Sequence, residues 1–308
     1  MKMRPAIVVG LLLLAVSGGC DSAVTFDRDN EIVVEGYLVA NREFGQIRVS
    51  RTQPVENRYE YTPFAIRGAD VQVRRMGASG EVEEAVQYSE DPDQPGVYIA
   101  EGVESVLPLS VYELLVSVPS TGEQLSSRTT VPGAYTILDS GPDTVVYQSL
   151  QPPEVTVSRS IYPGRPAIFV FSTESLDPSV ENLTPFYRDV VDPDDDFDEE
   201  ELEDYLINES PLLNEEGYEA ISEDVLKIKV PWLAFAFYGR NLLRSNALDD
   251  NLYDFIRSQS VQQGGSTFAP GEIPNIIDHV DGGTGIFGSY SVVERLVYVQ
   301  RPAGLGAK

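Results

Sequence analysis

Short runs of β-branched and aromatic residues, separated by turn residues, restrict the fold of this chain more than any other feature. About seven such runs lie between residues 31 and 133, and several alternate apolar with polar residues, as in residues 69–74. Pro95-Gly96 marks one of the turns between them. Short strands at this spacing predict an Ig-like β-sandwich over residues 31–133. The Cys–Trp–Cys pattern of true immunoglobulin domains is missing, so the prediction concerns the architecture only.

A second β-rich domain is predicted over residues 134–308, after a boundary at Gly133. Strand-like runs continue through this part, and prolines keep their ends sharp. A short helix is predicted from Asp249 or Asp250 to about Ser260, because either aspartate can cap it and apolar residues recur on one face. The predicted fold class is therefore mainly β, with an N-terminal Ig-like β-sandwich followed by a second β-rich domain that contains a short helix.

Residues 1–19 have the order of a secretory signal peptide. Lys2 and Arg4 come first, an apolar run follows over residues 6–16, and small residues precede Cys20. The apolar run is too short for a spanning helix, which needs about 20 apolar residues. We therefore expect residues 1–19 to be removed on export.

The end of this signal resembles the lipobox of bacterial lipoproteins, although Ser17 stands where the lipobox usually has Leu. In such proteins the cysteine receives a lipid and becomes the new N-terminus. We predict lipidation of Cys20, membrane attachment through this lipid, and a short polar tether over residues 20–30. The alternative is an ordinary signal peptide with an incidental cysteine, but Cys20 is the only cysteine of the chain and stands where an anchor needs it.

The charge of the chain is strongly negative. Asp and Glu number 49 against 22 Lys and Arg, which gives a net charge of −27. Removal of the two basic residues of the signal brings the exported chain near −29, or 20 minus 49. Such a surface repels the phosphates of nucleic acid, so we expect no nucleic-acid partner.

An acidic insertion interrupts the strand pattern at residues 189–204, where eleven of sixteen residues are acidic. Its carboxylates match the ligand positions of an EF-hand-like calcium loop. The candidate calcium ligands are Asp192, Asp194, Asp196, Asp198 and Glu203, with Glu200 at the position often bridged by water. Phe197 stands where the loop requires glycine, which favours the alternative of a solvated acidic insertion.

Three further features fail to indicate catalysis. The Gly-rich string at residues 283–288 precedes a predicted strand rather than a helix, so it predicts a tight turn or β-bulge and no dinucleotide site. His279 is the only histidine, and no G-x-S-x-G motif accompanies it. Trp232 opens an apolar run and is expected in the core or at its edge rather than in a sugar site. We assign no catalytic residue and no cofactor other than the candidate calcium.

Short motifs along the chain resemble one known family. They are VVEGY at 33–37, RGADV at 67–71, TVP at 130–132, Tyr238-Gly239, the 247–255 segment, Asn275 and GIFG at 285–288. Together they resemble the domain of unknown function 4249 family of bacterial lipoproteins, over nearly the whole exported chain. The acidic insertion is not part of that pattern. The resemblance implies an anchor in the outer membrane and an accessory role beside a TonB-dependent receptor, and it supplies no catalytic residues.

We therefore predict a non-enzymatic outer-membrane lipoprotein, on the periplasmic or cell-surface face, that serves as a binding or partner subunit of a TonB-dependent receptor. Two alternatives stay open. A surface glycan hydrolase would need a pair of carboxyl groups in a cleft. A calcium-dependent adhesive or structural lipoprotein would need the acidic insertion to bind its ion.

Overall fold

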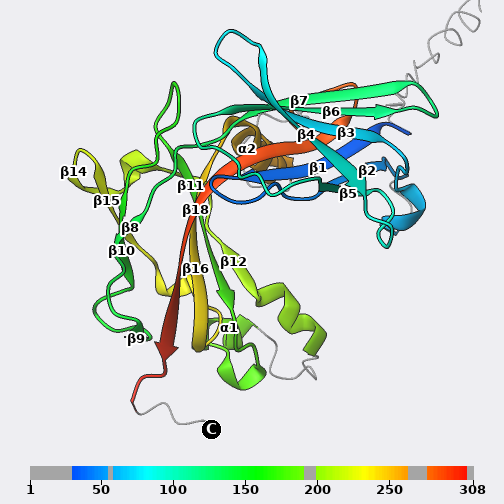
Figure 1. Cartoon of the computed structure of the whole chain (residues 1–308). Helices are drawn as coiled ribbons and strands as arrows, with labels where there is room; N and C mark the ends of the chain where they lie inside the picture. The colour runs from blue at the N-terminus through cyan, green and yellow to red at the C-terminus, as the bar shows by residue number, and fades with distance from the viewer. Residues whose placement is uncertain (1–29, 55–57, 191–198, 263–275, 304–308) are drawn as a thin grey trace, which may run out of the picture.

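The computed structural model describes residues 30–54, 58–190, 199–262 and 276–303, and these residues form a mainly β structure. Their strands form one sheet of 14 strands and a second sheet of four (Figure 1). The predicted fold class, mainly β with sandwich architecture, is therefore confirmed.

The N-terminal part is built from the first seven strands of the described chain. They are β1 (Ile32–Val39), β2 (Ile47–Arg51), β3 (Asp70–Met76), β4 (Val82–Glu90), β5 (Val97–Ala100), β6 (Val111–Val118) and β7 (Glu123–Thr130), with the 3-10 turn η1 (Thr62–Phe64) between β2 and β3. They hydrogen-bond in the order β1-β2-β5-β4-β3-β6-β7. In Figure 1, β3, β6 and β7 lie above β1, β2 and β5, so this sheet folds over into two layers.

The alternating strands bury one face each, as their sequence predicts. In β6 every second residue is buried, and Tyr112, Leu114 and Val116 are at most 1% exposed. They pack in one apolar cluster with residues of the neighbouring strands. Burying side chains of this kind stabilises the fold by about 1.5–3 kcal/mol each, which holds the two layers together.

The C-terminal part adds the remaining elements. Its strands are β8 (Ile137–Asp139), β9 (Thr144–Val146), β10 (Glu154–Ser158), β11 (Ile168–Ser175), β12 (Ile207–Glu209), β13 (Leu213–Asn214), β14 (Glu219–Ser222), β15 (Val225–Lys229), β16 (Gly239–Leu248), β17 (Val280–Asp281) and β18 (Thr284–Gln300). Its helices are α1 (Pro185–Val190) and α2 (Asp250–Gln262), with the 3-10 turns η2 (Val180–Asn182), η3 (Glu199–Tyr205), η4 (Glu215–Gly217) and η5 (Trp232–Ala234).

A second sandwich forms between the C-terminal strands of the large sheet and the small sheet. The small sheet has the order β14-β15-β10-β8 and lies beside β11, β16 and β18 (Figure 1). Phe169 of β11, Val157 of β10 and Val297 of β18 are fully buried in the apolar cluster between them. Side chains from strands far apart in the sequence therefore fill one core.

Strand β18 belongs to both sandwiches. Residues 284–290 pair in parallel with β1, and residues 290–299 pair antiparallel with β16. The half of β18 that pairs with β1 supplies Phe287 to the N-terminal core, and the half that pairs with β16 supplies Val297 to the C-terminal core. The predicted boundary at Gly133 falls after β7, but the two predicted domains share this strand.

Most of the Gly-rich string lies within β18, which begins at Thr284. Gly285 has φ 118°, and a Cβ atom there would collide with the carbonyl oxygen of Val34. Glycine thus allows β18 to lie close against β1. The chain bends only at Gly282 and Gly283, between β17 and β18. The expectation of a tight turn or β-bulge over the whole string is wrong from Thr284 onward, because pairing with β1 extends the strand back to that residue.

Helix α2 occupies the predicted place. The Asp249 carboxylate accepts the backbone N–H of Leu252 at 2.9 Å, which is the predicted cap. The sequence also predicts a strand from Trp232 to Tyr238, and this is wrong. Pro231 leads into η5 there, and consecutive residues from Phe235 onward are all buried, which an alternating strand does not allow.

Candidate functional site

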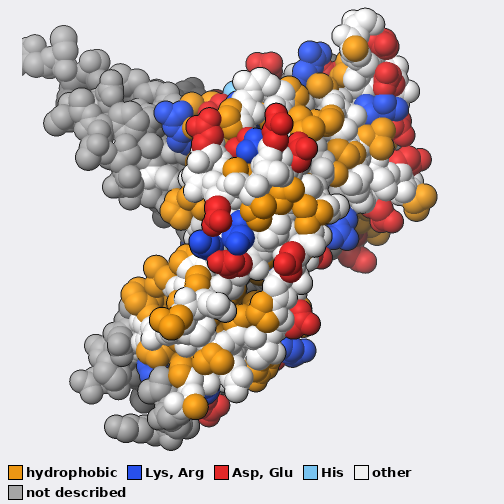
Figure 2. Space-filling view, turned by 90° about the vertical axis from the view of Figure 1, so that its left-hand side faces the viewer, with side chains coloured by type: hydrophobic (Ala, Val, Ile, Leu, Met, Phe, Trp, Pro, Cys, Tyr) orange, Lys and Arg blue, Asp and Glu red, His pale blue; other side chains and the backbone are white. Residues whose placement is uncertain are grey.

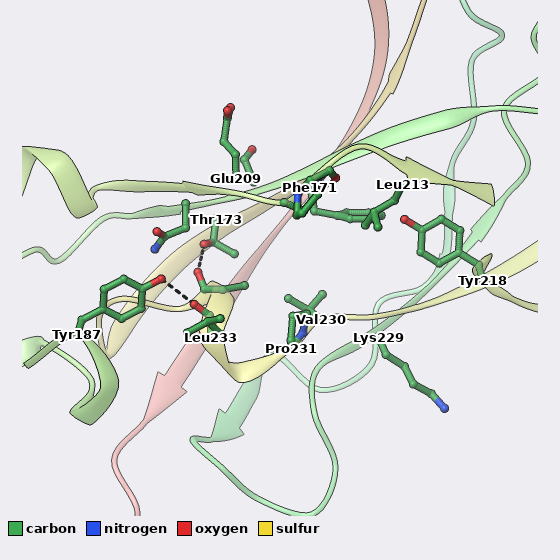
Figure 3. Close-up of a pocket in the computed structure, with 15 residues that line it drawn as sticks. Phe171, Thr173, Tyr187, Glu209, Leu213, Tyr218, Lys229, Val230, Pro231 and Leu233 are labelled. Atoms are coloured by element: carbon green, nitrogen blue, oxygen red, sulfur yellow. Dashed lines mark hydrogen bonds between the residues drawn. The ribbon is translucent and has the colours of Figure 1, made fainter. Parts of the chain in front are cut away.

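An apolar hollow of about 340 Å³ opens at the edge of the C-terminal sandwich. It lies between β11, β12 and β13 of the large sheet and the β15–η5 segment of the small sheet (Figure 3). The residues that define it are Phe171, Leu213, Tyr218, Val230, Pro231 and Leu233. We call this hollow the edge groove. Its volume lies at the lower end of the range for ligand pockets, about 300–1,000 Å³.

Local sequence features open the groove at this place. Pro211 interrupts the edge of the large sheet between β12 and β13. Next to it, the Ser210 N–H donates to the Phe171 carbonyl at 2.8 Å. The Phe171 N–H donates to the Ser210 hydroxyl, at 2.9 Å, rather than to a backbone carbonyl. Pro231 ends β15 on the other side and starts η5. Both sheets therefore end their regular pairing beside the same part of the core, which leaves apolar surface uncovered.

Aromatic rings form one wall of the groove. The Tyr218 ring stands edge-on to Phe171, with centroids 5.8 Å apart and planes at 90°. It also meets Phe169 edge-on at 5.8 Å, and Phe169 stacks on Phe171 at 6.3 Å. Edge-to-face contacts of this kind favour fixed ring positions. The wall is therefore preformed.

The opposite wall is held by side-chain bonds to backbone carbonyls. The Tyr187 hydroxyl donates to the Leu233 carbonyl at 2.8 Å, and the Thr173 hydroxyl donates to the Ala234 carbonyl (Figure 3). These two bonds tie η5 to α1 and to β11. Because both hydroxyls are occupied, they hold the wall in place rather than face a ligand.

Tyr218 carries a polar group beside the groove. Its hydroxyl oxygen is buried, and no described residue hydrogen-bonds it. In Figure 3 the hydroxyl points toward Phe171 and Leu213. Burial raises the pKa of Tyr218 above its usual value, so the phenol stays neutral.

The charged residues at the rim face away from the hollow. Figure 3 shows the Lys229 and Glu209 side chains extending outward. The Lys229 ammonium lies 3.2 Å from the Glu219 carboxylate and 4.0 Å from that of Glu154. The groove therefore offers a ligand a largely apolar surface, with no unpaired cation among the described residues that line it.

A larger hollow on the N-terminal part is a weaker candidate. Its volume is about 520 Å³, and it lies over β3, β6 and β7 with largely polar lining. Two pairs of polar side chains in or beside it are hydrogen-bonded: Arg74 donates to the Gln72 amide oxygen at 2.6 Å, and Gln87 donates to the Asp70 carboxylate at 2.7 Å. These groups are satisfied without a ligand.

The predicted calcium and lipid sites fall mostly outside the described residues. Cys20, Asp192, Asp194, Asp196 and Asp198 all do so. Glu203 is described, and it lies exposed on η3. Within the described part of the chain, no group of three or more His, Cys, Asp or Glu residues is arranged to hold a metal ion.

His279 and Trp232 make structural contacts. The His279 Nε2 atom lies 2.8 Å from the Asp254 carboxylate, which joins α2 to the segment before β17. Trp232 is half-buried against the C-terminal core, and its indole N–H donates to the Ser149 carbonyl at 3.3 Å. The prediction that Trp232 lies at the core edge is confirmed.

Sequence patterns did not indicate the edge groove. Phe171 reads as an ordinary strand residue, Tyr218 carries no signal of its own, and only Pro211 and Pro231 indicate that regular pairing ends. The two prolines lie twenty residues apart, and nothing local shows that they meet at one hollow. Among the described helices, none has the length and apolarity needed to cross a bilayer.

Comparison with known proteins gives one family match. A family model described as "Domain of unknown function (DUF4249)" matches residues 21–295. No curated protein matches the sequence.

Several solved structures show only distant likeness. Salmonella alpha-2-macroglobulin reacted with methylamine is 8% identical over 88% of this chain and 15% of its own, with a TM-score of 0.24. Escherichia coli alpha-2-macroglobulin activated by porcine elastase is 8% identical over 88% of this chain and 20% of its own, with a TM-score of 0.22. A tetra-tandem repeat from the extending region of a large adhesion protein is 8% identical over 88% of this chain and 50% of its own, with a TM-score of 0.23. This chain thus spans half or less of these structures, and scores this low support no functional argument.

Proposed function

From the premise that this chain belongs to the family described as domain of unknown function DUF4249, we propose that it is a non-enzymatic binding lipoprotein of the outer membrane. It works as an accessory subunit of a TonB-dependent receptor and holds a ligand in the edge groove. The edge groove is the observation that carries the binding role.

The start of the sequence supports the membrane location. A basic start, a short apolar run and a small-residue ending before Cys20 are typical of an exported lipoprotein. An anchor with two acyl-chain signals gives stable attachment, since each buried methylene contributes about 0.8 kcal/mol. The polar tether after Cys20 then leaves the folded part free beside the membrane.

The edge groove supports binding rather than hydrolysis. Glu209 is the one carboxylate among the described residues that line it, and its side chain extends outward (Figure 3). Glycoside hydrolysis requires two carboxyl groups that flank the bond to be broken. An apolar hollow with few polar groups is instead typical of a site that binds a small molecule.

Exposed apolar side chains support a contact with a partner protein. Figure 2 views the side that carries the small sheet and shows hydrophobic side chains gathered over the lower part of the molecule. Leu138 of β8, Ile221 of β14, Leu150 and Leu233 are each more than half exposed. Clustered apolar surface of this kind marks interaction sites.

The test is a purification from native membranes. A C-terminally tagged chain is extracted in mild detergent, and the proteins that co-purify are identified by mass spectrometry. We expect a TonB-dependent receptor in near-equal amount. The matched control is Cys20→Ser, which removes the lipid acceptor and should move the protein from the membrane to the soluble fraction.

Two results would contradict the proposal. Recovery of the wild-type chain without any outer-membrane receptor would remove the accessory role. A Cys20→Ser chain that stays in the membrane fraction would remove the lipid anchor.

A further inference from the structure

We propose that the parallel pair of β1 and β18 is a mechanical clamp, which resists a load applied between the membrane anchor and the C-terminal sandwich. The load enters the fold at the start of β1, because residues 20–30 form the predicted tether between Cys20 and this strand. The inference rests on the proposed function for the source of the load, which is a partner protein that holds the C-terminal sandwich while the lipid holds Cys20. It follows from the direction in which the two strands are then pulled.

The two strands run parallel, and the load pulls them in opposite directions. β1 is pulled from its N-terminal end, and β18 is pulled from its C-terminal end, which lies at the lower end of the molecule in Figure 1. Parallel strands that are pulled in this way slide along each other, so the load acts along their evenly spaced hydrogen bonds together. All seven register pairs share it, from Val33–Thr284 to Val39–Tyr290.

The second edge of β1 and its buried face also oppose its withdrawal. β1 lies between β18 and β2 in the sheet, and residues 32–36 pair with β2. Val34 and Leu38 are at most 1% exposed and belong to the N-terminal core. Sliding β1 out of the sheet exposes these side chains to water while the backbone pairs break. The strand is therefore held on both edges and on one face.

The point at which the tether enters is fastened to both layers of the N-terminal sandwich. The Arg51 guanidinium of β2 donates to the Asn30 carbonyl at 2.6 Å and to the Glu123 carboxylate of β7 at 2.9 Å. The Asn30 and Glu31 N–H groups donate to the Thr52 hydroxyl at 2.9 and 3.1 Å. Charge-assisted bonds such as the one between Arg51 and Glu123 are the stronger kind. A load on the tether meets these contacts before β1 can slide.

The far half of β18 is held more extensively than β1. Its residues 290–299 form ten register pairs with β16, and residues 298–300 pair with β9. Val297 and Val299 are fully buried in the C-terminal core. The uninterrupted backbone of β18 passes the load from this half to the half that pairs with β1. We therefore expect the sliding of β1 to be the step that limits unfolding under load.

Single-molecule pulling of the exported chain in two directions tests the clamp. Cys20 is the only cysteine, so its unlipidated thiol takes one handle and a C-terminal tag takes the other. The matched direction uses Cys20→Ser with Glu43→Cys, which moves the handle to an exposed position after the other end of β1. From there the load meets the Val39–Tyr290 pair first and separates the pairs one after another. The Cys20 handle should need at least about twofold more force, because in that direction the pairs share the load.

Two variants locate the resistance within the N-terminal sandwich. Gly285→Ala disturbs the close contact of β18 with the Val34 carbonyl, and it should shorten the lifetime under constant force from the Cys20 handle by at least about tenfold. Leu114→Ala removes a fully buried side chain of the same core, on β6, which pairs with β3 and β7 rather than with β1 or β18. It should shorten that lifetime much less, although it destabilises the core at equilibrium.

Equal unfolding forces in the two directions would overturn the clamp. A greater loss of lifetime from Leu114→Ala than from Gly285→Ala would overturn it too, because the resistance would then come from core packing. The handle takes the place of the lipid, so the pulling result does not depend on the membrane experiments. If the forces differ but no receptor co-purifies, the clamp stands and the accessory role fails. If the receptor co-purifies and the forces agree, the accessory role stands and the clamp fails.

Discussion

Asp249 is a buried carboxyl group that joins the two sandwiches. It is fully buried, and its backbone N–H donates to the Ser289 carbonyl of β18 at 3.0 Å. Its carboxyl group bonds the Thr129 hydroxyl of β7, and that hydroxyl lies 2.5 Å from the Ser289 hydroxyl. Burial raises the pKa of Asp249 to about 7, so this residue keeps its proton in mildly acidic solution.

The Asp249→Asn variant should change how stability depends on pH. The unfolded carboxyl group ionises near pH 3.9 and the folded one near 7, so the stability that Asp249 contributes is complete below about pH 4 and declines as the pH rises to 7. Asparagine mimics the protonated group and does not titrate. In urea unfolding, the free energy of unfolding of the variant relative to that of the wild type should rise by on the order of 1–4 kcal/mol between pH 4 and pH 8.

A control for this experiment lies in an exposed turn. Asp93→Asn removes a carboxyl group there and should leave the pH dependence of the wild type unchanged. Parallel stability curves for wild type and Asp249→Asn would show that Asp249 ionises alike in both states and would contradict the prediction.

At the scale of elements, the close pairing of β1 with β18 depends on one glycine. Gly285 combines φ 118° with close contact to the Val34 carbonyl. Any side chain there requires both an unfavourable backbone angle and a shift of β18 away from β1. The register of the parallel pair, and with it the place of Phe287 in the N-terminal core, depends on this position.

Gly285→Ala should therefore destabilise the protein by at least about 2 kcal/mol, measured as the free energy of unfolding in urea. Gly80→Ala is the matched control, because Gly80 also has positive φ, 87°, but open space around it. The free energy of unfolding of the control variant should fall by only about 1 kcal/mol. Similar losses for both variants would show that the contact with Val34 does not matter.

At the scale of the whole molecule, β18 couples the two sandwiches. One uninterrupted strand contributes Phe287 to the first core and Val297 to the second. Loss of order along β18 removes a partner strand from both β1 and β16. We therefore expect the described parts to unfold together rather than one after the other.

Calorimetry tests this coupling. The wild type should unfold in one transition, and both Phe287→Ala and Val297→Ala should lower its single Tm. The Phe287→Ala change should lower the free energy of unfolding by about 3–5 kcal/mol, and the smaller Val297→Ala truncation should lower it by less. Two separate transitions, with each variant lowering only one, would show that the predicted boundary at Gly133 divides independent folding units.

The sequence by itself determined what depends on neighbours in the chain. The alternation of β6 follows from side chains that point to opposite faces, and the start of α2 follows from a capping aspartate. The family motifs also stand in the sequence without any structure. Cys20 and the acidic insertion remain predictions from the sequence, since Cys20 and most of the calcium candidates lie outside the described residues.

Only the tertiary structure decided what depends on distant segments. The edge groove requires Phe171, Tyr218 and Leu233 to meet, although they come from three segments separated in the chain. The burial of Asp249 requires β7 and β18 to close over it, and the pairing of β18 with β1 joins opposite ends of the sequence. Local residue patterns carry no information on such meetings, because long-range packing sets them.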